Sequence, residues 1–67
     1  MVPRYEEFIR DVLTTLHANI RELRDRKGFA DAEELPHIEA RKAAYEEAVS
    51  IIRDSAGEFG IPKDVVD

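Results

Sequence analysis

The sequence predicts an all-α protein, a two-helix antiparallel hairpin. Apolar residues recur every three or four positions in two segments, at about residues 3–27 and 36–59, which is the spacing of helices with one buried face. Glycine follows each segment, as is typical of helix ends. We therefore expect one helical-hairpin domain over residues 1–67, in which residues 28–35 connect the helices and residues 60–67 form a C-terminal tail.

The first segment has helix signals at both ends. Pro3 suits the first helical position because its missing N–H would have no partner there. Glu6 and Glu7 lie in the first turn, where the helix dipole favours negative charge. Gly28 follows a basic last turn, and Phe29 stands where a Schellman cap places its hydrophobic contact. The predicted core-facing stripe, an arc of about 140°, consists of Tyr5, Phe8, Ile9, Val12, Leu13, Leu16, Ile20 and Leu23.

The second segment is bounded by proline and glycine. Asp31 and Glu34 have capping-box spacing, which predicts a short turn ahead of a helix that begins at about Pro36. Gly60 suits a left-handed helix cap, and Pro62 suits a stop after it. Because the helices are antiparallel, the end of the second should meet Tyr5 and Phe8 of the first. The large apolar residues expected to face the first helix are Ile38, Tyr45, Val49, Ile52 and Phe59.

A second stripe of small and apolar residues runs along the second helix, about 60–120° round from the first stripe. It consists of Ala44, Ala48, Ile51 and Ser55. One partner helix cannot cover both stripes, so we expect a second copy of the chain to cover this one and to give a homodimeric four-helix bundle with two-fold symmetry. Because alanine is also the best helix former, the alternative is an exposed face that only favours helix formation.

The size of the chain favours such an assembly. It has 67 residues and no cysteine, so disulfides and thiolate metal sites are excluded. A domain of this size buries only about 60% of its unfolded surface, and its core rarely supplies more than about 3–5 kcal/mol. Oligomerisation or unusually good packing must supply the remaining stability.

Composition and charge bear on location and partners. The chain is 43% hydrophobic and 37% charged, which is too charged for a membrane span. No signal peptide or transit segment is visible, and with no cysteine this fits a cytoplasmic protein. The net charge is −5, of which residues 3–27 carry +1 and the residues from Gly28 onward carry −6. A strongly acidic second half argues against wrapping on a phosphate backbone.

A polar stripe on the first helix is a candidate partner-binding face. Its basic members, Arg10, His17, Arg21 and Arg24, lie with Thr14 at alternating four- and three-residue spacing, so they share one side of the helix. In length, charge balance and expected topology the chain resembles the plasmid copy-control Rop family, short hairpins that dimerise into a four-helix bundle and bind paired RNA loops. That resemblance implies an RNA-binding regulator as the alternative function. The plainer interpretation is a solvated face with i,i+4 ion pairs, at Glu6–Arg10, Arg21–Asp25 and Glu22–Arg26.

Two motifs point weakly to other chemistry. Glu34 and His37 have the Glu-x-x-His spacing of ferritin-like metal sites, but Pro36 interrupts the pair and basic residues of the first helix should face it. The segment from residue 56 to residue 66 has the spacing of a helix-turn-helix turn, yet only Lys63 there is basic. We therefore expect neither a metal or cofactor site nor a DNA-reading helix.

Catalysis is not expected either. Ser50 and Ser55 lie on a helix with no histidine nearby on the same face. Glu46 and Glu47 are adjacent, so their side chains diverge by about 100° and cannot converge on a substrate. The sequence therefore favours a small non-enzymatic regulatory or adaptor protein that acts through an unidentified protein partner.

Overall fold

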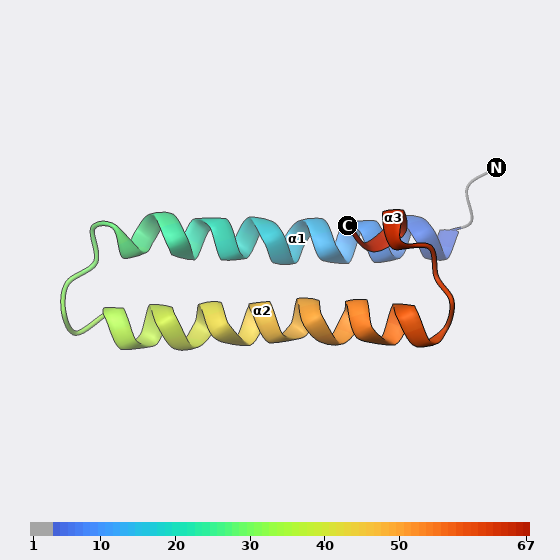
Figure 1. Cartoon of the computed structure of the whole chain (residues 1–67). Coiled ribbons are helices and arrows are strands. Elements are labelled where there is room, and N and C mark those ends of the chain that lie inside the picture. The colour runs from blue at the N-terminus through green and yellow to red at the C-terminus, as the bar shows by residue number, and fades with distance from the viewer. Residues whose placement is uncertain (1–3) are drawn as a thin grey trace.

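The chain folds into a hairpin of two long helices with a short third helix. The computed structural model describes residues 4–67 and contains α1 (Arg4–Lys27), α2 (Leu35–Glu58) and α3 (Lys63–Val66), with no strand among these residues. Helices α1 and α2 lie side by side and antiparallel, and α3 folds back over α1 (Figure 1). We call the end where α2 runs into α3 the open end, and the end where residues 28–34 join α1 to α2 the loop end. The all-α prediction is confirmed. The predicted role of Pro3 lies outside the described residues.

The core is a narrow row of apolar side chains between α1 and α2. Its buried cluster consists of Leu13, Ile20, Val49, Ala56 and Val66, against which Ile9, Leu16, Tyr45, Ile52 and Ile61 pack. Leu23 and Ile38 are buried nearer the loop end. No side chain among residues 4–67 is completely enclosed, so the core is one layer thick.

The aromatic residues expected to complete this core at the open end do not enter it. Phe8 is 69% exposed, Tyr5 58% and Phe59 82%. Phe8 and Phe59 lie on the flanks of their helical stripes, so they point to one side of the hairpin and away from the line between the helices. The predicted burial of Tyr5 and Phe8 against the end of α2 is therefore wrong within one copy of the chain.

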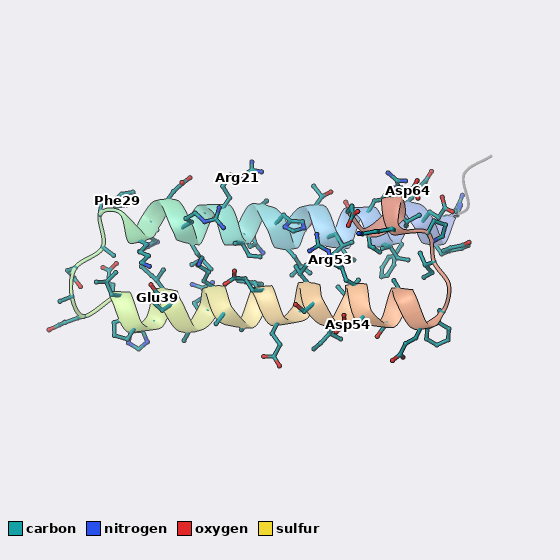
Figure 2. The ribbon with its side chains drawn as sticks, viewed as in Figure 1. Arg21, Phe29, Glu39, Arg53, Asp54 and Asp64 are labelled. Atoms are coloured by element: carbon teal, nitrogen blue, oxygen red, sulfur yellow. The ribbon has the colours of Figure 1, made fainter. Side chains whose placement is uncertain are left out.

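The end of α1 differs from the predicted Schellman cap. The N–H of Gly28 donates to the carbonyl of Asp25 at 3.1 Å, and the N–H of Phe29 donates to that of Arg26 at 3.2 Å. These bonds, each between residues three apart, satisfy the carbonyls of Asp25 and Arg26 without a left-handed residue. In residues 4–67 a positive φ occurs at Gly60 and not at Gly28. Phe29 projects from the loop end and is exposed, so its predicted hydrophobic contact is absent (Figure 2).

The start of α2 is prepared by a side-chain turn. Asp31 Oδ1 accepts hydrogen bonds from the backbone N–H groups of Glu33, at 3.0 Å, and Glu34, at 2.9 Å. This turn was predicted from the spacing of Asp31 and Glu34. The helix begins at Leu35, one residue before the expected start, with Pro36 in its first turn, where a missing N–H costs no hydrogen bond.

Ion pairs at the loop end join α1 to the connection and to α2. Arg26 lies 3.9 Å from Glu34, and Lys27 pairs with Glu39. The hydrogen bond and charge of Lys27 hold the pKa of the Glu39 carboxyl below its usual range. The basic last turn of α1 thus meets acidic residues of the connection and of α2. Among the described residues the predicted pairs within α1 do not form: Glu6–Arg10, Arg21–Asp25 and Glu22–Arg26.

The end of α2 is a complete Schellman cap. After the last helical residue, Glu58, the chain reaches Gly60 at a φ of 70°. The N–H of Gly60 donates to the carbonyl of Gly57 at 3.2 Å, and the N–H of Ile61 donates to that of Ala56 at 2.9 Å. The predicted glycine cap is therefore confirmed, and it turns the chain back along the hairpin.

The turn lets the tail pack as α3. Val65 and Val66 are buried, and Val66 joins the core cluster. Arg53 Nε of α2 donates a hydrogen bond to the Val66 carbonyl at 3.3 Å. The sequence predicts residues 60–67 as a C-terminal tail, and within this tail Lys63–Val66 form one short helix.

At the two glycines near the end of α2, substitution by alanine should have opposite effects on the free energy of unfolding. Gly60→Ala places a Cβ in the left-handed region, so the free energy of unfolding should fall by about 1–2 kcal/mol. Gly57 is helical with open space around its Cβ position, so Gly57→Ala should raise the same quantity by about 0.5–1 kcal/mol. Urea unfolding followed by circular dichroism measures both, and a Gly60→Ala variant as stable as the original chain would contradict the cap.

Candidate interaction surface

The stripe predicted to bind a second copy lies on the outside of α2. Ala44, Ile51 and Ser55 are exposed, Ile51 to 57%, and Ala48 is half-buried. Helix α1 packs instead on the stripe that contains Val49. Within one copy the chain therefore leaves this second stripe mostly uncovered.

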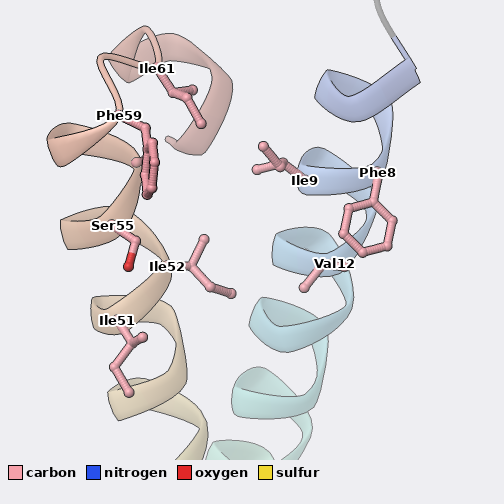
Figure 3. Close-up of a pocket in the computed structure, with 9 residues that line it drawn as sticks. Phe8, Ile9, Val12, Ile51, Ile52, Ser55, Phe59 and Ile61 are labelled. Atoms are coloured by element: carbon pink, nitrogen blue, oxygen red, sulfur yellow. The ribbon is translucent and has the colours of Figure 1, made fainter.

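An apolar groove continues this stripe at the open end. It has a volume of about 290 Å³. Figure 3 shows Val12 of α1 and Ile52 of α2 on its opposite walls. Of the residues that line it, only Ser55 has a polar side chain; the full set is Phe8, Ile9, Val12, Ile51, Ile52, Ser55, Ala56, Phe59 and Ile61. We call this feature the open-end groove.

The same side of the hairpin is polar toward the loop end. A smaller hollow there is lined by residues of both helices, namely Asn19, Glu22, Leu23, Arg26, Arg41 and Tyr45. Asn19 and Arg26 follow Val12 at seven-residue steps, and Arg41 precedes Ala48 by the same step, so they share the side of the groove. One side of the molecule therefore changes from apolar at the open end to polar and basic at the loop end.

The opposite side carries α3 and most of the predicted basic face. Arg10 and His17 line a hollow with Val65 and Asp67 of the tail. His17 and Arg24 line a second hollow, of about 280 Å³, with Arg53 and Ser50 of α2. Both hollows lie beside the flank of α1 that faces away from Phe8.

The four predicted face residues are exposed but do not act as one unit. Arg21 projects into solvent (Figure 2). His17 lies between the tail and α2, and Arg24 lies beside α2. Arg53 was missed by the sequence analysis because it belongs to the other helix, and no local spacing connects it to His17 or Arg24.

Residues 4–67 contain no group of three or more histidine, aspartate or glutamate side chains placed to hold a metal ion. Glu34, half of the Glu-x-x-His motif, lies next to Arg26. No helix in this part of the chain is both long enough and apolar enough to cross a membrane.

No protein-family model, curated protein or solved structure matches this chain.

Because α3 covers one side of the core, we expect Val66 to contribute to the stability of the fold. Val66→Ala removes two buried methyl groups from the core cluster, so the free energy of unfolding should fall by about 1–2 kcal/mol. Lys63→Ala, an exposed change in the same short helix, should alter it by less than about 0.5 kcal/mol. Denaturant unfolding of both variants checks this, and equal effects of the two changes would show that α3 does not contribute to the core.

Proposed function

We propose that the chain is a small non-enzymatic regulatory or adaptor protein that acts through protein–protein interaction as a cytoplasmic homodimer. The observation that supports this is the open-end groove, with Phe8, Ile51 and Phe59 exposed around it. Monomeric proteins rarely leave a large contiguous apolar patch in water, and such patches mark interaction sites. Aromatic residues are also enriched in protein interfaces.

A second copy is the partner that fits the groove and the stripe together. The groove shares Ile51 and Ser55 with the stripe that continues through Ala48 and Ala44, so both form one surface on α2. Fully burying an aromatic or branched side chain contributes about 1.5–3 kcal/mol. On this scale, burying three such residues on each copy would contribute at least as much as the whole core of a chain this small, which supplies about 3–5 kcal/mol. A homodimeric four-helix bundle is the arrangement that buries them.

The adaptor role follows from the separation of the two sides. A copy docked in the groove leaves the α3 side accessible, with Arg10, His17 and Arg24 exposed on it. Exposed arginine and histidine favour a partner with an acidic surface. The dimer would then present this basic face twice.

Nucleic-acid binding is the second candidate. The observation that favours it is the meeting of His17, Arg24 and Arg53 from two helices on one side of the hairpin. Carboxylates of Glu46 and Asp67 line the same hollows and would oppose a phosphate backbone. We therefore place this function second to protein binding.

The homodimer predicts a specific response to a charge in the stripe. Ile51→Glu places a carboxylate at the centre of the interface, so the variant should sediment as a monomer at tens of micromolar, where the original chain sediments as a dimer. Ser50→Glu adds the same charge to the next residue, which lies on the other side of α2, and should leave the dimer intact. Analytical ultracentrifugation distinguishes the two. A folded original chain that stays monomeric at these concentrations would contradict the proposal.

The salt dependence of RNA affinity distinguishes the protein-binding function from the nucleic-acid-binding function. Under the protein-binding proposal, the chain and an Arg21→Glu, Arg24→Glu variant should show the same weak affinity for a structured RNA hairpin between about 50 and 200 mM salt. An Arg4→Glu, Arg26→Glu variant carries the same charge change on the other flank of α1 and serves as the control. If the original chain binds the RNA with an affinity that falls steeply with salt, and only the Arg21, Arg24 variant loses it, RNA binding is the function.

A further inference from the structure

The outer face of α2 specifies how two copies would pair, an inference that rests on the proposed homodimer. We propose that a second copy lies antiparallel on α2 in one register. In that register Ile51 meets Ala48 of the partner copy, Ser55 meets its Ala44, and Glu58 meets its Arg41.

The pairing surface is a regular seam along α2. Its members alternate at four- and three-residue spacing, as in the a and d positions of a coiled coil. Helix α1 does not cover it, since every member is exposed except the half-buried Ala48. We call it the outer seam; it consists of His37, Arg41, Ala44, Ala48, Ile51, Ser55 and Glu58. It lies roughly 110° round the helix from the stripe that packs on α1, which suits a helix with two neighbours in a four-helix bundle.

The sizes of the seam residues favour an antiparallel partner. Ala44 and Ala48 lie in the half of the seam toward the loop end, and Ile51 lies in the half toward the open end. A two-fold axis perpendicular to the helix places the larger half of each copy on the smaller half of the other. A parallel partner would place Ile51 against Ile51 of the other copy and would leave a gap between the facing alanines, which costs contact energy.

Shifts by one heptad are disfavoured by burial of charge. Moving the partner by seven residues along the helix in one direction sets Ile51 against the partner's Arg41. Moving it by seven residues in the opposite direction sets Ala48 against the partner's Glu58. Both shifts place an ionised group on an apolar position without a counter-charge. In the proposed register each apolar position meets another small or apolar residue.

The charges at the two ends of the seam also match in this register. Glu58 lies at the open end and Arg41 toward the loop end, and within residues 4–67 neither has an ion-pair partner. The antiparallel pairing brings each against the other, twice by symmetry, whereas parallel pairing brings Glu58 against Glu58. Such exposed pairs add little affinity, but they discriminate between registers.

Paired cysteines test the register directly, because the chain has no cysteine of its own. Residues 44 and 55 are about 16 Å apart along one helix at 1.5 Å per residue, so they cannot form a disulfide within one copy. An Ala44→Cys, Ser55→Cys variant should oxidise to a covalent dimer in dilute solution. It should do so faster than Ala44→Cys, Ala48→Cys or Ile51→Cys, Ser55→Cys, which report the two shifted registers. Ala43→Cys, Asp54→Cys lies off the seam and should form little covalent dimer.

Charge reversal provides a second measurement that does not depend on oxidation. Glu58→Arg should raise the dimer dissociation constant roughly 2- to 30-fold, since two ion pairs are replaced by like charges. Adding Arg41→Glu to the same chain should restore the original value. Asp54→Arg makes the same charge change one turn earlier, off the seam, and should have little effect. Circular dichroism shows that each variant keeps its helices.

The outcomes separate this inference from the proposed function. A dimer by sedimentation whose fastest disulfide belongs to a shifted pair, or whose Glu58→Arg defect is not restored by Arg41→Glu, overturns the register but leaves the homodimer in place. An original chain that remains monomeric overturns both. Fast cross-linking of the 44–55 pair together with charge restoration supports both.

Discussion

Two helices that pack only on each other can each bury one stripe, and this limit governs the rest of the molecule. The core is a single row of side chains between α1 and α2, and no described side chain is fully enclosed. Apolar residues on the flanks of the stripes, such as Phe8 and Ile51, therefore remain in contact with water. Any further burial has to come from another element or from another molecule.

The short helix α3 supplies part of that burial, and it supplies it on one side only. The left-handed Gly60 redirects the chain, so that Val65 and Val66 pack near Leu13 on the α3 side of the open end. The other side keeps the open-end groove. On the basic side of the molecule α3 thus covers the core, and on the apolar side no described element does. This asymmetry depends on the backbone conformation of one glycine.

The asymmetry gives the proposed function its physical basis. The proposed self-association through the apolar side and the proposed recognition through the basic side would use different residues, so the two interactions need not compete. Apolar burial would supply most of the dimer affinity, because the charges along α2 are exposed and screened by salt. The basic side would contribute orientation and association rate more than affinity.

Most of the fold was predictable from the sequence, because helices and their caps depend on residues within about four positions of one another. The periodicity located both long helices, Asp31 and Gly60 were correctly assigned to the turns around α2, and the second stripe on α2 was visible as a pattern. The candidate site was predictable only in part. Of the predicted stripe, Ile51 and Ser55 line the open-end groove, whereas the groove's α1 wall was expected to be core.

Only the tertiary structure decided what happens at the flanks of the helices. Periodicity assigns Phe8 and Phe59 to apolar stripes, but whether such residues are covered depends on which side the next element packs. The same reason applies to Arg53, which joins His17 and Arg24 only because antiparallel packing brings α2 beside α1. The sequence alone therefore determined the helices, their ends and the presence of surplus apolar surface. The arrangement of the three helices in space determined which part of this apolar surface stays exposed.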